Sequence, residues 1–171
     1  MFKIWLESTF TDLYQSAVDA FPHTTKRQHA TGEVQIHEMS WLPFIGMRTL
    51  LLRALAINET SGTHYRPIIL FKNVQYSNEG SDLIDIVSSD NGLKYRLKRL
   101  SEDRDVLLRC QCQDYAWRFI HWNALDKSNY GRDRKPYEAI SNRGPINPTE
   151  SPGMCKHLLR LMEVLRAARL V

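Results

Sequence analysis

Every cysteine of the chain belongs to one of two short units, and these units constrain the fold more than any other feature. Cys110 and Cys112 are separated by one residue, and Cys155 stands two positions before His157. Three sulfurs and one imidazole form a closed tetrahedral ligand set for Zn²⁺, and thiolates favour zinc over magnesium or calcium. A closed set leaves no position for water, so the predicted zinc is structural and the two units must meet in the fold.

An alternative interpretation treats the cysteines as small buried hydrophobic residues, which is a common role of free cysteine. Cys110 and Cys112 would then face the core, and His157 would be an ordinary helix residue. The metal is favoured because each cysteine has another sulfur or an imidazole within two positions. A disulfide framework is not expected, because the chain has three cysteines, an odd number, and lacks a secretion signal.

Local patterns predict where each unit lies. Residues 106–123 form a long apolar run rich in aromatic side chains, which predicts a strand. Cys110 and Cys112 would point to the same side of it, because alternate residues of a strand share a face. Residues 155–170 are amphipathic and predict a helix. Free backbone N–H groups at its start favour a thiolate at Cys155.

The whole pattern predicts an α+β fold: a mainly antiparallel β-sheet body with an N-terminal helix and a C-terminal zinc-stapled strand, loop and helix. Helical spacing predicts a helix over 10–21, capped by Ser8 or Thr9. The pair Asn91 and Gly92, between two apolar runs, predicts a hairpin turn. The predicted strands are residues 2–6, 34–41 with a slip in phase, 49–56, 68–76, 83–87, 93–97 and 106–123.

A length of 171 residues suits a single domain. Residues 1–105 are predicted to form the β-rich body with its N-terminal helix. Residues 106–171 form the zinc-binding part, packed with the body as one unit. Residues 127–153, between the two ligand units, make a Gly- and Pro-rich loop with a basic excess. A much shorter connection would be enough to bring the two ligand pairs to one metal ion. Because long loops in compact domains are usually functional, this loop is predicted to project and contact a partner.

The charge of the chain permits an anionic partner without requiring one, since Lys and Arg number 23 against 19 Asp and Glu. The loop interleaves basic residues with Tyr130 and Tyr137, a composition that suits the backbone and bases of a nucleic acid. It equally suits an acidic face of a protein subunit. The candidate contact residues are Arg109, Lys127, Arg132, Arg134, Lys135, Lys156 and Arg160.

Neither an enzyme nor a membrane protein is expected. The chain has no serine-hydrolase, phosphate-loop, dinucleotide-binding or zinc-protease motif, so no small-molecule substrate is predicted. No apolar run is long enough to cross a bilayer. Glu7 interrupts the N-terminal apolar residues before a signal peptide can form, so we expect a cytoplasmic protein with reduced thiols.

The two units and their surroundings resemble the SWIM-type zinc finger, a family that reads C-x-C, a spacer and then C-x-H on a strand pair followed by a helix. The run MCKHL at residues 154–158 is a close local match. The resemblance covers residues 106–165, implies the same four zinc ligands, and attributes the long spacer to an insertion at 127–153. The family is associated with DNA binding and protein interaction. It therefore implies a non-enzymatic zinc-binding module that mediates protein or nucleic-acid interaction.

Two further segments resemble uncharacterised proteins of large tailed bacteriophages. They are residues 21–30 (FPHTTKRQHA) and residues 67–74 (PIILFKNV). This resemblance implies an alternative function, a structural subunit of a phage particle whose zinc only stabilises the fold. Its partners would be protein subunits of a larger assembly, and it would reside in the host cytoplasm or the virion.

Overall fold

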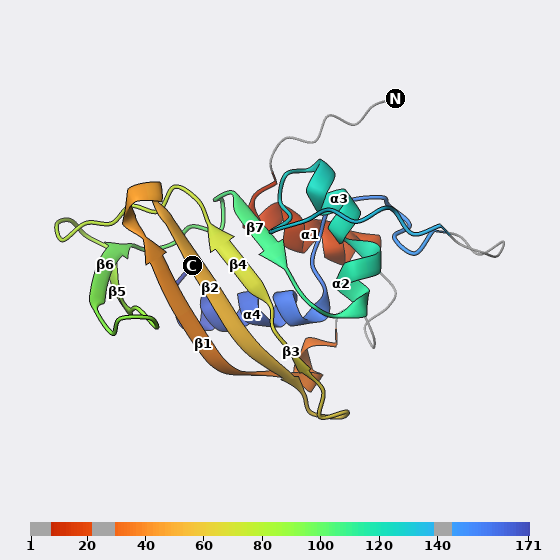
Figure 1. Ribbon diagram of the computed structural model, residues 1–171, viewed down its shortest axis with the longest axis horizontal. Helices are drawn as coiled ribbons and strands as arrows, with labels where there is room; N and C mark the ends of the chain where they lie inside the picture. Colours follow the sequence, from red (N-terminus) through yellow and green to blue (C-terminus); the bar gives the residue numbers. More distant parts are fainter. Residues whose placement is uncertain (1–7, 22–29, 139–144) are drawn as a thin grey trace.

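The part of the chain that the structure describes folds into a five-stranded sheet, a separate two-stranded sheet and four α-helices (Figure 1). The computed structural model describes residues 8–21, 30–138 and 145–171. The predicted strand at 2–6 lies outside these ranges. The predicted α+β class is confirmed. No helix in the described ranges combines the length and apolar composition that crossing a bilayer requires.

The main sheet is antiparallel throughout, in the order β1-β2-β4-β7, with β3 also paired to β2. Leu51 lies opposite Leu42 and Leu70 on its two neighbouring strands, which fixes the register. The predicted slip in phase is a bulge between Ile36 and Glu38. The strands are β1 (Val34–Phe44), β2 (Thr49–Asn58), β3 (His64–Tyr65), β4 (Ile68–Phe71) and β7 (Val106–Arg109).

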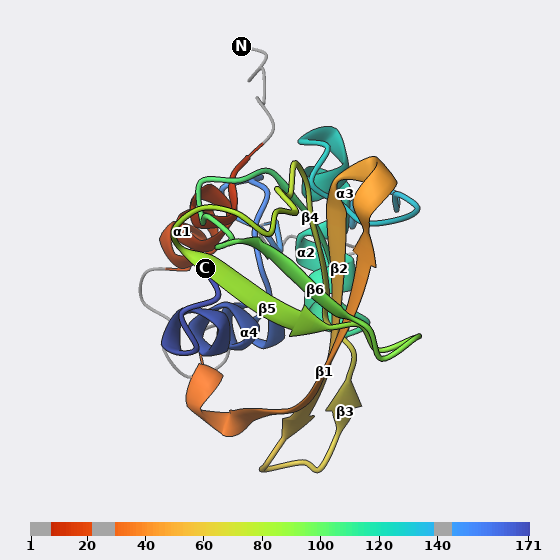
Figure 2. The same cartoon turned by 90° about the vertical axis from the view of Figure 1, so that its left-hand side faces the viewer.

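One face of the main sheet packs against two helices, α1 (Phe10–Ala20) and α4 (Lys156–Ala167), which lie on the same side of it (Figure 2). Leu52 and Ile69 on this inner face are buried, as are Leu158 and Leu165 of α4. Thr9 begins α1 with a capping box. The core therefore lies between the sheet and the two helices that carry the ends of the described chain.

Residues with positive φ mark turns beside the strands. The predicted hairpin is confirmed as β5 (Leu83–Val87) and β6 (Lys94–Lys98), and its turn contains Gly92 at φ 68°. Glycine adopts this conformation without a steric penalty. The strand predicted over 68–76 is shorter than expected, because β4 ends at Phe71 and Asn73 turns the chain at φ 54°.

The prediction of a strand over 106–123 is wrong beyond Arg109. The chain there forms two short helices, α2 (Gln113–Arg118) and α3 (Ile120–Leu125). Cys112 caps α2, with its sulfur accepting the backbone N–H of Tyr115 at 3.3 Å. Tyr115 and Phe119 are four residues apart and both buried, so the aromatic run satisfies a helical spacing as well as an extended one.

A buried polar network joins these short helices to β7 and to the segment before α4. The side-chain amide of Asn123, fully buried, donates to the carbonyl oxygen of Gly153 and to the Tyr115 hydroxyl, both at 3.0 Å. It also accepts the N–H of Gly153 at 2.7 Å, and Tyr115 donates to the carbonyl of Leu108 at 2.7 Å. A side chain at Gly153 would lie 2.8 Å from the Phe119 ring, so only glycine fits.

We predict that Asn123→Ala lowers the free energy of unfolding by about 2–4 kcal/mol, because it leaves both buried backbone groups of Gly153 without a partner. Denaturant unfolding followed by circular dichroism measures the change. Gln15→Ala on the exposed side of α1 is the control and should cost about 0.5 kcal/mol or less. Equal effects of the two substitutions would show that the network does not hold the segment before α4.

Candidate metal centre

The four side chains that the sequence pairs as ligands meet at one point of the fold. Cys110, Cys112, Cys155 and His157 are all buried, and their ligand atoms lie within 4.8 Å of one another. Each offers one donor atom, and four such donors could hold one metal ion. The structure thus brings the complete predicted ligand set together.

One strand end and two helix starts position these donors. Cys110 directly follows β7, and Cys112 is the N-cap of α2. Cys155 is the N-cap of α4, and His157 lies in the first turn of that helix. The unpaired N–H groups at a helix start stabilise negative charge, and the Cys112 sulfur accepts one of them, so its position favours thiolate. The Cys155 sulfur accepts no N–H of its helix.

The two sulfurs of the first unit do not converge in the predicted way. The sequence places Cys110 and Cys112 on one face of a continuous strand, but β7 ends at Arg109. The chain turns at the exposed Gln111, and this turn directs both sulfurs to the centre. Helix capping by Cys112, rather than strand alternation, therefore sets the geometry of this unit.

The imidazole of His157 turns its Nδ1 atom to the sulfurs. Nδ1 lies 3.8 Å from Sγ of Cys110 and 3.8 Å from Sγ of Cys155. The Tyr65 ring of β3 packs on the imidazole, with 4.1 Å between ring centroids. Among the described residues, Nε2 of His157 has no hydrogen-bond partner. Nδ1 is therefore the atom that would bind a metal.

Three buried thiols in contact cannot readily all lose their protons. Burial raises the pKa of Cys110 and Cys155 well above the usual thiol value, because a buried thiolate loses its hydration. Hydrogen bonds from these two thiols lower the pKa of Cys112. Burial thus opposes negative charge on Cys110 and Cys155. A divalent cation would supply the positive charge that three thiolates need.

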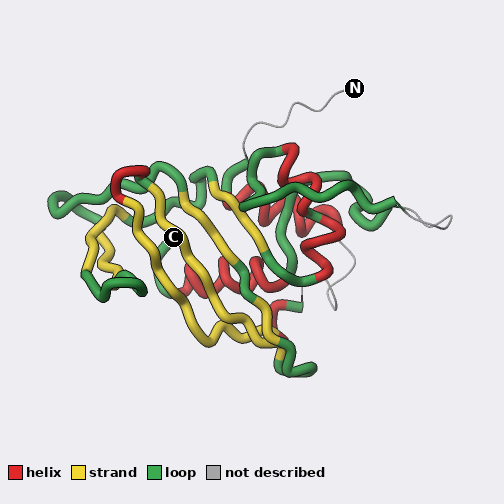
Figure 3. The backbone as a smooth tube through the Cα atoms, in the orientation of Figure 1, coloured by secondary structure: helices red, strands yellow, loops and turns green. Residues whose placement is uncertain are grey.

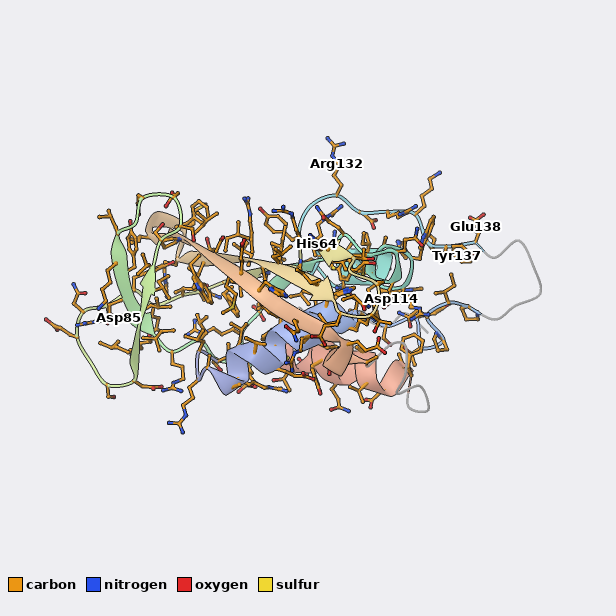
Figure 4. All side chains as sticks on the ribbon, turned by 90° about the horizontal axis from the view of Figure 1, so that it is seen from below. His64, Asp85, Asp114, Arg132, Tyr137 and Glu138 are labelled. Carbon is orange, nitrogen blue, oxygen red and sulfur yellow. The ribbon has the colours of Figure 1, made fainter. Side chains whose placement is uncertain are left out.

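Beside the centre, residues 131–138 form an exposed segment that we call the arm. Figure 3 shows the loop after α3 reaching out beyond the short helices, and in Figure 4 the labelled side chain of Arg132 points away from the body. Arg109 holds the root of the arm by donating from Nη1 to the carbonyl oxygens of Tyr130 at 3.0 Å and of Arg132 at 3.3 Å. The arm therefore starts from a fixed point next to Cys110.

The arm contacts α2 through a cation and two aromatic rings. The Arg134 guanidinium lies 3.5 Å from the centroid of the Trp117 ring, and the Tyr137 ring meets Trp117 edge-on at 5.5 Å. Trp117 is 41% exposed and Tyr137 is 43% exposed. The arm thus presents an exposed group of aromatic and basic side chains, joined through α2 to the metal centre.

The structure does not gather all seven predicted contact residues on one surface. Lys156 lies 3.6 Å from Glu33, and Arg109 is engaged at the root of the arm. Arg160 donates to the carbonyl oxygen of Val34 and pairs with the carboxylate of Glu163, so it stabilises the fold. The exposed candidates are Lys127, Arg132, Arg134 and Lys135.

Sequence reasoning missed two aromatic residues of this region. A cavity of about 540 Å³ opens beside the centre, and its lining includes Tyr65, Trp117, Lys156 and His157. Trp117 lies in α2, directly after the first ligand pair. Had the helical spacing of this segment been recognised, Trp117 could have been predicted to lie beside the ligands. Tyr65 comes from β3, and no local pattern links it to the ligands.

Comparison of the chain with protein-family models, curated proteins and solved structures gives no match. The functional assignment therefore depends on the geometry of the centre and of the surface around it. Two features carry it: the four buried donors, and the exposed arm beside them.

We predict that the three thiols of the folded, metal-loaded protein resist an aromatic disulfide reagent, and that a strong chelator makes all three reactive. The reason is that a bound metal removes the nucleophilicity of its thiolates and holds the site closed. Absorbance of the released thiol measures the reaction, and circular dichroism monitors the fold in parallel. The same slow reaction with and without chelator would mean that burial alone protects the cysteines.

Proposed function

We propose that the four buried donors bind one structural Zn²⁺ ion. Three sulfurs and one ring nitrogen are donors that zinc takes in tetrahedral geometry. With Zn–S about 2.3 Å and Zn–N about 2.0 Å, such an ion separates sulfur from nitrogen by about 3.5 Å. This agrees with the 3.8 Å between Nδ1 of His157 and the sulfurs of Cys110 and Cys155. All four positions are then filled, so the zinc activates no water, and we propose a non-enzymatic protein.

We propose further that the protein is a SWIM-like zinc module that binds nucleic acid through its arm. The observation that carries this proposal is the exposed group of Trp117, Arg134 and Tyr137. Aromatic rings stack on bases, while Arg132 and Lys135 of the same arm attract phosphates. The zinc fixes α2 beside the arm and so holds the stacking ring in place.

We predict one zinc per chain in the wild type and none in Cys155→Ala, which should lose at least the structure of α4. Zinc in comparable structural sites contributes about 10–16 kcal/mol of apparent binding free energy. This equals or exceeds the usual net stability of a domain, about 5–15 kcal/mol. Elemental analysis measures the metal, and far-UV circular dichroism measures the helix.

Leu165→Ala is the matched control, because it removes buried volume from the same helix without touching a ligand. It should cost about 2–5 kcal/mol and keep one zinc per folded chain. A metal-free wild type of full stability would contradict the proposed zinc. So would a Cys155→Ala variant that unfolds no more easily than Leu165→Ala.

We predict that the wild type binds nucleic acid with an affinity that falls as salt rises, and that Arg132→Gln combined with Lys135→Gln weakens binding about tenfold. Removing one phosphate interaction with a single strand makes the slope of log affinity against log salt shallower by about 0.7. Fluorescence anisotropy over a range of salt concentrations measures both quantities. Zinc content and thermal stability should not change, because both side chains are exposed.

Lys98→Gln combined with Arg169→Gln is the control, since it removes two exposed charges far from the arm. Absence of salt-dependent binding, together with sedimentation in a large assembly, would instead support the structural subunit of a phage particle. The same samples are analysed for cleavage with Mg²⁺ or Mn²⁺ added. Cleavage that disappears in Asp114→Asn would overturn the non-enzymatic assignment.

A further inference from the structure

Three cavities share a single lining residue, Gln111, which lies beside the metal centre. Their volumes are about 480, 540 and 370 Å³. Gln111 is exposed and stands between Cys110 and Cys112, so the metal ligands on either side fix its backbone. We call the lining of these three cavities, which meet at Gln111, the Gln111 groove.

One end of the Gln111 groove lies on the face of the main sheet that points away from α1 and α4. Arg53 alternates with the buried Leu52 and Ala54, so its side chain projects from this outer face. Arg53 and Arg66 are both exposed, and both line the cavity of about 480 Å³. In the described ranges neither has a side-chain hydrogen bond or ion pair. Two guanidinium groups without a partner in a concave site attract an anion.

The other end of the groove reaches the arm. The cavity of about 370 Å³ is lined by Arg109, Arg132 and Arg134. The cavity of about 540 Å³ is lined by Trp117 and Lys156, among others. Basic side chains therefore line each of the three cavities. The exposed Trp117 ring lines the same cavity as the metal-centre residues Cys112 and His157.

The acidic side chains of the groove cancel only part of this charge. Across the three cavities, seven basic side chains stand against four acidic ones. Asp114 pairs with Arg118, whereas Asp90 and Asp133 accept hydrogen bonds from neutral donors and keep their negative charge. The cavity of about 480 Å³ has two arginines and two acids, so the basic excess of the groove lies toward the arm. The lining acids are Glu38, Asp90, Asp114 and Asp133.

We propose that the Gln111 groove holds a single-stranded nucleic acid, whose backbone runs from Arg53 and Arg66 past Gln111 to Arg132. This inference rests on the proposed function and narrows it to one class of nucleic acid. Trp117 and Tyr137 are partly exposed rings, and Arg134 already stacks on Trp117. Unpaired bases can stack on such rings, whereas the faces of paired bases are covered by their neighbours in a duplex. The Gln111 amide both donates and accepts hydrogen bonds, so it can contact a base edge.

The test measures binding of the zinc-loaded full chain to a labelled oligo-deoxythymidine of about 16 nucleotides. A duplex of the same length, oligo-dT paired with oligo-dA, is the comparison. We expect the single strand to bind about tenfold more tightly than the duplex. We expect Arg53→Gln combined with Arg66→Gln to weaken single-strand binding about tenfold. The salt slope should become shallower by about 1.4, for two phosphate interactions.

The control Lys98→Gln combined with Arg169→Gln removes the same charge elsewhere and should leave the affinity within about twofold of the wild type. Zinc content and unfolding midpoints of both double variants should match the wild type, because all four side chains are exposed. An equal loss of affinity in the control and in the Arg53 and Arg66 variant would overturn the groove, since net charge alone would then explain binding.

The remaining outcomes separate this inference from the proposed function. If only the arm variant weakens binding, the path through Arg53 and Arg66 is wrong and the proposed function stands. If the duplex binds as tightly as the single strand, the assignment to single strands is wrong. If neither probe binds, the proposed function fails as well. If a poly-glutamate peptide binds as tightly as the oligonucleotide, the partner is an acidic protein segment and the inference is overturned.

Discussion

The contact between Sγ of Cys110 and Nδ1 of His157 joins residues 47 positions apart, and the rest of the C-terminal half depends on it. This contact brings the end of β7 against the start of α4. Because burial opposes ionisation of Cys110 and Cys155, all three sulfurs can be thiolates only beside a positive charge. A cation is the simplest group that completes it, and its binding free energy then becomes folding free energy for everything that the contact connects.

Polar side chains extend this junction outward in two directions. Asn123 ties α3 to Gly153, two residues before Cys155, so the second ligand unit is presented by hydrogen bonds as well as by the sulfur cluster. On the opposite side, Arg109 fixes the root of the arm immediately before Cys110. The exposed segment that we assign to binding is therefore anchored next to the ligands, although its own side chains lie in water.

The sequence predicted features that depend on near neighbours. The two ligand units and the turn at Gly92 could be predicted because a few adjacent residues determine each. The helix α2 could not, because its aromatic residues fit both a strand and a helix, and the decision came from the capping sulfur of Cys112. Arg53 escaped notice for another reason: its role depends on a groove built from distant segments that meet only in the folded chain.

The placement of Gln111 between two metal ligands has a thermodynamic consequence for the proposed groove. In the proposed groove, a nucleic-acid strand that crosses Gln111 contacts a backbone that Cys110 and Cys112 would hold from both sides when they share a metal. Nucleic acid would then bind the metal-loaded form more tightly than the metal-free form. Thermodynamic linkage is reciprocal: if the metal raises the affinity for nucleic acid by some factor, bound nucleic acid raises the affinity for the metal by the same factor. If both proposals hold, metal binding and nucleic-acid binding form one coupled equilibrium, although the ion itself would contact no nucleic acid.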